Sequence, residues 1–111
     1  MYTVEKKQDF AIIKNDRTRA EIELTNIDEM NNILHDLIGK KESKILINFK
    51  NVVYIDSSGL GVLMDAIKKL KEQDRELGIL SVPREILEVF MATQIAQFFK
   101  YYKVVSNKNT S

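Results

Sequence analysis

The segment from residue 44 to residue 82 constrains the fold of this chain more than any other part. It contains the apolar stretches "KILINF" and "VVYI", then the amphipathic pattern "SSGLGVLMDAIKKLK", then the apolar stretch "LGILSV". The β-branched and aromatic residues of the first stretches predict a strand covered on both faces, at the centre of a sheet. Two apolar strands joined by a helix of about 15 residues form a β-α-β unit, whose strands run parallel with a right-handed crossover.

The predicted helix of this unit has one apolar face and one charged face. The charged face carries Asp65, Lys68, Lys69 and Glu72. The apolar stripe follows the i, i+3, i+4, i+7 spacing of a helix that packs on a sheet, and it consists of Leu60, Leu63, Met64, Ile67 and Leu70.

The region before this unit is expected to contain a hairpin. "FAIIK" and "AEIEL" have the composition of short strands, and the polar segment "NDRTR" separates them. In the second strand, Ala20, Ile22 and Leu24 share one face, and Glu21 and Glu23 share the other. This alternation predicts a hairpin with one solvent-exposed face.

Two further helices are indicated by apolar spacing and end signals. "TNIDEMNNILHDLIGKK" places Thr25 and Asp28 as a capping box and Gly39 as a stop signal. In "PREILEVFMA", Pro83 suits the first turn of a helix. The residues of that helix expected to face inward are Ile86, Leu87, Phe90 and Met91. "IAQFFKYYKVV" then predicts a short helix and a terminal strand.

Together these elements predict an α/β sandwich with a mixed sheet of four or five strands and helices mainly on one face. With 111 residues, the chain is long enough for one core and too short for two. We therefore expect a single domain over residues 1–105, followed by a flexible C-terminal tail at residues 106–111.

The composition argues against several classes of function. The formal net charge is +1, without the clustered basic surplus that nucleic acid or an anionic membrane would attract. The chain has no cysteine, no membrane-length apolar run and no apolar signal-peptide core at its N-terminus. We expect a cytoplasmic protein that has no direct association with a membrane.

The junction "YIDSSGLG" places polar residues where a buried strand turns into a helix. The first turn of a helix has unpaired N–H groups and a partial positive charge, so any of Asp56, Ser57 and Ser58 suits the cap. One cap is enough, however, and ligands usually bind at the carboxyl ends of strands in α/β sheets. Physical reasoning alone leaves a functional surface and plain capping equally weighted here.

Catalysis at this junction is not supported by the residues around it. A serine nucleophile needs a base and a Gly-x-Ser-x-Gly turn, but residues 55–59 read "IDSSG" and the only histidine is His35. "GLGVLM" lacks the lysine and hydroxyl of a phosphate-binding loop. His35 has no partner at metal-ligand spacing, so we expect it on the surface. We predict a protein that is not an enzyme and needs no cofactor or metal.

The stretch "INFKNVVYIDSSGLGVLMDAIKKLK" resembles the signature of STAS domains, and specifically of bacterial anti-sigma factor antagonists. The resemblance implies a STAS-like sandwich. It also implies that the unphosphorylated protein binds an anti-sigma factor that is also a serine kinase and thereby releases a sigma factor. Phosphorylation by that kinase, with its own ATP and magnesium, ends the binding, and a serine phosphatase restores it.

In the family, the serine directly after the aspartate is the phosphorylated residue, and this position corresponds to Ser57. Ser58 is the alternative acceptor, with a capping or turn role as the competing interpretation. The surface that binds the partner is expected to include Asp56, Ser57, Ser58, Gly59, Gly61, Val62 and Asp65. Gly59 is also expected to serve the tight turn.

A second interpretation is a STAS interaction module in another assembly, such as a stress-signalling scaffold or a membrane-transport complex. The acceptor serine favours the first interpretation. Many relatives carry a Gly-Glu-Leu-Asp-like segment after the first hairpin, where this chain has "AEIELTNIDEM". It keeps an acid in Asp28 but lacks the glycine, so the resemblance does not carry over docking in this region.

Overall fold

The computed structural model describes residues 1–41 and 44–103 of the chain. The tail predicted at residues 106–111 lies outside these described residues. The strands are β1 (Tyr2–Lys7), β2 (Phe10–Asn15), β3 (Ala20–Ile22), β4 (Lys44–Asn48), β5 (Val52–Ile55), β6 (Leu77–Leu80) and β7 (Phe99–Tyr102). The helices are α1 (Ile27–Lys40), α2 (Ser57–Lys71), α3 (Arg84–Ala92) and the short 3-10 helix η1 (Ala96–Phe98).

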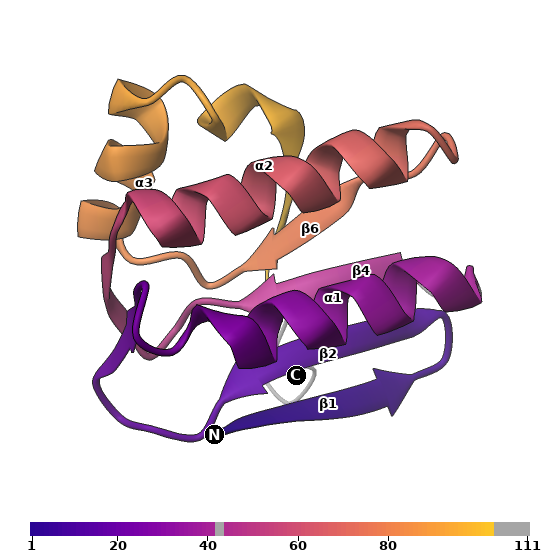
Figure 1. The fold of residues 1–111 in the computed structure, drawn as a ribbon, viewed down its shortest axis with the longest axis horizontal. Coiled ribbons are helices and arrows are strands. Elements are labelled where there is room, and N and C mark those ends of the chain that lie inside the picture. The colour runs from indigo at the N-terminus through magenta and orange to yellow at the C-terminus, as the bar shows by residue number, and fades with distance from the viewer. Residues whose placement is uncertain (42–43, 104–111) are drawn as a thin grey trace, which may run out of the picture.

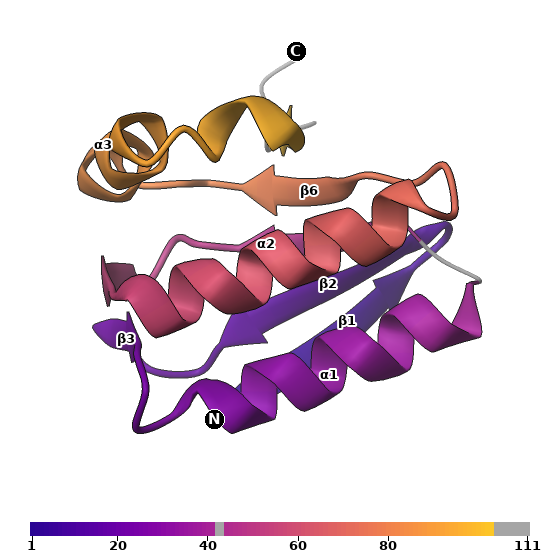
Figure 2. The same cartoon turned by 45° about the horizontal axis from the view of Figure 1, so that its top comes forward.

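The main sheet has five strands in the order β1-β2-β4-β6-β7. Strands β2, β4, β6 and β7 pair in parallel, and β1 pairs antiparallel with β2. Helices α1 and α2 lie side by side on one face of this sheet (Figure 1), and the turned view of Figure 2 shows the same arrangement. The predicted mixed α/β sandwich is therefore confirmed.

The β-α-β unit has the predicted parallel strands. Its strands are β4 and β6, with Ile45 paired to Leu77 and Ile47 to Ile79, and its helix is α2. These four side chains are buried between the sheet and the helices. The apolar stretch before α2 is divided, however: β4 lies at the sheet centre, whereas β5 leaves the main sheet.

The predicted N-terminal hairpin is wrong. Strand β3 does not pair with β2 but forms a separate two-stranded parallel sheet with β5, in which Ile22 pairs with Ile55. Both edges of β2 are already occupied, by β1 and by β4. Strand β1 was not expected from the sequence, because its residues "YTVEKK" are mostly polar and its side chains are mostly exposed.

The ends of α1 also differ from the prediction. The N-cap residue is Asn26, and its side chain makes no capping hydrogen bond. Instead, Asn26 Oδ1 accepts a hydrogen bond from the Glu23 amide at 3.1 Å, and Asn26 Nδ2 donates to the Glu21 carbonyl at 2.8 Å. The predicted capping box is therefore absent, and Gly39 lies within the helix, which ends at Lys40.

The apolar stripes of α2 and α3 are buried only in part. Leu63, Ile67 and Leu70 of α2 are buried, as are Ile86 and Phe90 of α3. Leu60 and Leu87 are half-buried, but Met64 and Met91, both expected to face inward, are 43% and 61% exposed. Each stripe is wider than the surface that the sheet offers to it, so its outermost methionine remains in solvent.

The core beyond α2 is built from aromatic side chains. Phe90 of α3 meets Phe49 edge-on with ring centroids 5.6 Å apart, and it meets Phe99 of β7 at 4.9 Å. Such contacts contribute roughly 0.5–1.5 kcal/mol each beyond simple burial. They hold α3 at the end of the domain where α2 begins (Figure 1).

Candidate functional site

Asp56 is the N-cap of α2, the first of the roles left open by the sequence. Its backbone is extended, with φ −102° and ψ −176°, and its Oδ1 accepts a hydrogen bond from the Gly59 amide at 3.0 Å. Its Oδ2 accepts a second one from the Leu24 amide at 3.1 Å. The hydrogen bond from Gly59 holds the pKa of Asp56 below its usual range, and the one from Leu24 acts in the same direction.

The two serines are therefore not needed as the cap. Ser57 is exposed and is the first residue of α2, and Ser58 is half-buried. Within residues 1–41 and 44–103, neither hydroxyl has a hydrogen-bond partner. The turn thus presents one carboxylate with a structural role and, next to it, an exposed hydroxyl that the fold does not use.

Gly59 is buried under the junction because its α-carbon lies against strands β3 and β5. A Cβ atom at this position would lie 2.7 Å from Ile55 Cγ1 and 2.9 Å from the backbone oxygen of Ile22. Real Cβ atoms do not approach other atoms this closely. The sequence suggested a turn role for this glycine, and the structure adds a close approach of the helix to the strands.

The other predicted partner-binding residues lie further along α2. Gly61 is exposed, with open space where a Cβ atom would lie, and Val62 is half-buried. Asp65 lies two turns from Ser57, about 12 Å along the axis. Its Oδ2 is 3.0 Å from Lys69 Nζ and 3.5 Å from His35 Nε2. Asp65 therefore belongs to a contact between α1 and α2 and lies apart from the first turn of α2.

His35 lies on the surface, as predicted, but it is not isolated. Its Nε2 is 2.6 Å from Lys69 Nζ and 3.5 Å from Asp65 Oδ2. The sequence places His35 and Lys69 far apart, and only the packing of α1 on α2 brings them together.

Leu24 is a surface residue that sequence reasoning misplaced. The alternating pattern put it on the inward face with Ala20 and Ile22, but β3 ends at Ile22 and Leu24 is 72% exposed. Its amide is fixed by Asp56, so its side chain is held next to the start of α2. Tyr54, 50% exposed on β5, adds a second large apolar group two residues before Asp56.

Acidic side chains gather near this junction. The pKa of Glu23 is raised, first by its hydrogen bond with Glu21 and further by the negative charges of Glu21 and Asp56. Glu21, Glu23 and Asp56 therefore lie close enough to one another to interact electrostatically.

Similarity to known proteins agrees with this geometry. The STAS domain family model matches residues 3–108. The chain belongs to the STAS domain family. It is 33% identical over 74 residues to an anti-sigma-B factor antagonist of Staphylococcus aureus, a segment that covers 67% of this chain and 68% of that protein. The family predicted from residues 56–61 and their surroundings is confirmed.

Solved structures share the fold of this STAS domain. A STAS domain protein from Planctomyces limnophilus superposes with a TM-score of 0.78 at 20% identity, covering 97% of this chain and 93% of that one. The anti-sigma factor antagonist SpoIIAA in its unphosphorylated form gives a TM-score of 0.74 at 14% identity, covering 99% and 92%. The fold is thus that of known STAS domains over nearly the whole chain.

Two other features are absent from the part of the chain that the structure describes. Across residues 1–41 and 44–103, no group of three acidic or histidine side chains is placed to hold a metal ion. In the same residues, no helix has the length and apolar character needed to cross a membrane.

The capping role of Asp56 predicts a pH-dependent contribution to the stability of this STAS domain. Its pKa is lower in the folded protein than its ordinary value of 3.8, so the contribution is complete above that value and is lost as pH falls through the folded pKa. We expect Asp56→Asn to lower the free energy of unfolding at neutral pH, and this deficit to shrink below about pH 4. Urea unfolding of both proteins at several pH values measures it. A deficit that stays constant would contradict the capping role of the charge.

Proposed function

We propose that this STAS domain is an anti-sigma factor antagonist whose binding is switched off by phosphorylation of Ser57. The unphosphorylated protein binds an anti-sigma factor that is also a serine kinase, and the sigma factor is released. A serine phosphatase returns the protein to its binding form. The observation that carries the proposal is the exposed Ser57 hydroxyl, which has no hydrogen-bond partner among the described residues, because Asp56 caps α2 instead. The protein binds and does not catalyse, and we place it in the cytoplasm, where sigma factors act.

The chemistry of the modification suits this position. The Ser57 hydroxyl oxygen attacks the γ-phosphorus of ATP bound to the kinase, the bond to ADP breaks, and the hydroxyl proton passes to a base of the kinase. The first turn of α2 favours negative charge, because its free amides and helix dipole point toward this position. The STAS domain itself can therefore accept the phosphate without refolding.

The same phosphate would disrupt a partner interface. It adds about 1.5–2 negative charges at neutral pH. The carboxyl groups of Asp56 and Glu23 already lie near this position. A partner surface that fits a neutral hydroxyl here would clash with the larger phosphate and repel its charge. The complex would therefore dissociate without any change in the fold of this domain.

The surface proposed for the partner is centred on the first turn of α2. Asp56, Ser57, Ser58, Gly61 and Val62 are exposed or half-buried there. Gly59 is buried, so we assign it to the support of this turn. The half-buried Asp65 would mark the far edge of the surface.

Partner capture tests this function. Unmodified protein and Ser57→Asp are immobilised separately and exposed to a lysate of the native organism, and retained proteins are identified by mass spectrometry. We expect an ATP-binding, kinase-like anti-sigma factor with the unmodified protein only. Retention of scaffold or transporter subunits by both forms would contradict the proposal and would favour a STAS module in another assembly.

A further inference from the structure

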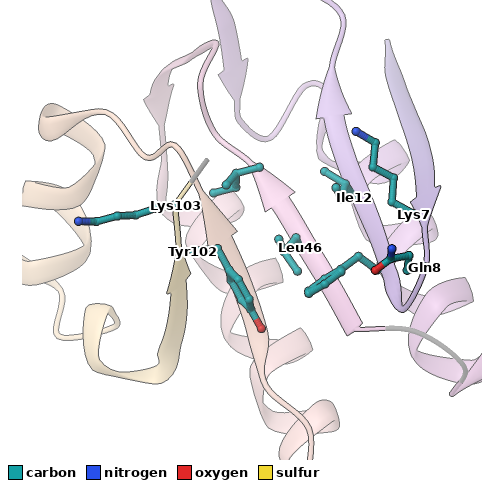
Figure 3. A pocket seen from close by; sticks show the side chains of 8 residues that line it. Lys7, Gln8, Ile12, Leu46, Tyr102 and Lys103 are labelled. Atoms are coloured by element: carbon teal, nitrogen blue, oxygen red, sulfur yellow. The ribbon is translucent and has the colours of Figure 1, made fainter. Parts of the chain in front are cut away.

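The face of the main sheet opposite α1 and α2 carries an apolar groove. Figure 3 views this face, with the helices behind the strands. The groove has a volume of about 610 Å³ and is lined by Lys7, Gln8, Phe10, Ile12, Leu46, Leu80, Tyr102 and Lys103. It lies on the other side of the sheet from α2, so the proposed role of Ser57 does not involve it.

The floor of the groove is fixed by tight packing. Leu46 is only 4% exposed, although none of the described helices covers this face, because neighbouring side chains lean over it. The ring of Tyr102 crosses Gly78, where a Cβ atom would lie 2.8 Å from Tyr102 Cε1. That ring meets Phe10 edge-on with centroids 5.6 Å apart. The groove is therefore a preformed apolar strip with an aromatic wall.

Lysines lie around this strip: Lys7 is on the edge strand β1, Lys100 is on the edge strand β7, and Lys44 starts the central strand β4. The ammonium of Lys44 lies 5.6 Å from the ring centroid of Phe10, and that of Lys100 lies 5.7 Å from the ring centroid of Tyr102. Lys7 extends over the strip from β1, whereas the Lys103 ammonium points away from it in Figure 3. By strand register, Lys14 and Glu5 share this face, and Glu5 Oε2 lies 3.8 Å from Lys7 Nζ. Asp74 and Glu76 line a neighbouring hollow with Lys44 and Lys100, and the lysines around the strip still outnumber these acids.

We propose that this groove docks an amphipathic helix of a partner protein, with an apolar stripe flanked on both sides by acidic residues. An apolar strip with cations along both edges is complementary to such a helix. An α/β sheet commonly has helices on both faces, and the partner would supply the missing layer.

Charge also favours an acidic partner helix over two other possible occupants of the groove, a second copy of the chain and the C-terminal residues 104–111. A second copy of the chain would bring its own lysines against these lysines, which is unfavourable. The C-terminal residues 104–111 read "VVSNKNTS", with one lysine and no acid, so their sequence lacks the complementary charge. An acidic helix from another protein is the occupant that the surface favours.

Selection from a random display library of helical peptides about 16 residues long tests the docking site. The full-length protein is the target, and the affinity of enriched peptides is measured by fluorescence anisotropy. The test variant is Lys7→Glu with Lys100→Glu. The charge-matched control is Lys6→Glu with Arg84→Glu, because Lys6 faces α1 from the other side of β1 and Arg84 starts α3.

We expect enriched peptides to carry apolar residues at helical spacing flanked by Asp or Glu. The test variant should weaken their binding at least about tenfold, and the control should leave it unchanged. The proposal would be overturned by no enrichment, by enrichment without acidic residues, or by equal loss in both variants. Self-association of the unliganded protein that the test variant abolishes would also overturn it, in favour of a second copy. Ser57→Asp should bind these peptides as the unmodified protein does, so this test is independent of the phosphorylation switch.

Discussion

Replacing Ser57 with aspartate is expected to weaken binding of the anti-sigma factor by more than about a hundredfold, which corresponds to about 3 kcal/mol. The new carboxylate would stand beside Asp56, whose charge also acts on Glu23. It would also be favourable at the start of α2, so the free protein should remain folded. The loss therefore arises in the complex, where the charge is desolvated against a partner shaped for a hydroxyl.

Two further substitutions at this position separate charge from size. Ser57→Ala should keep binding within a few-fold of the unmodified protein, because the hydroxyl has no partner in the described part of the fold. The side chain in Ser57→Asn has nearly the size of aspartate without its charge. Its affinity for the partner should lie between those of Ser57→Ala and Ser57→Asp. Titration calorimetry with the purified partner measures all three. Equal affinities for Ser57→Asp and Ser57→Asn would show that repulsion is not the cause.

Replacing Gly59 with alanine should destabilise the domain by about 2 kcal/mol, within the range usual for an overpacked core. The added Cβ would lie 2.9 Å from the backbone oxygen of Ile22, which cannot move without displacing β3. At about 4–8 °C for each kcal/mol, the melting temperature should fall by roughly 10 °C. The backbone of Gly59 is ordinary helix, so space and not conformation makes glycine necessary here.

Gly61 offers a matched control two residues away on the same helix. No atom lies within 4 Å of a Cβ at this position, so Gly61→Ala should gain about 0.5–1 kcal/mol from helix propensity alone. Thermal unfolding of both variants followed by circular dichroism gives the comparison. A stable Gly59→Ala protein would contradict the close packing of α2 on β3 and β5.

The parts of the fold that were predictable are those determined locally. Strands β4 and β6 and helix α2 follow from composition and helical spacing within one continuous segment, and the parallel pairing follows from the crossover. Strand β1 was not predictable, because "YTVEKK" becomes a strand only through its pairing with β2. The pairing of β3 with β5 depends on residues 20–22 and 52–55, which are far apart in the sequence.

The same contrast between local and long-range features holds for the candidate site. The sequence located the junction and its polar residues, but it left Asp56, Ser57 and Ser58 as equal candidates for the cap. Only the hydrogen bonds of Asp56 to Gly59 and Leu24 assign the cap and leave Ser57 unused. The exposure of Leu24 was missed because alternation does not reveal where a strand ends. The groove over Leu46 depends on the register of several strands, which one sequence does not provide.

The most direct test of the central claim is to phosphorylate the protein with its captured anti-sigma factor, ATP and magnesium, and to locate the phosphate by mass spectrometry. The account predicts one phosphate on Ser57, none on Ser57→Ala, and loss of binding by the phosphorylated protein. A phosphate on Ser58 alone, or a phosphorylated protein that still binds its partner, would contradict it.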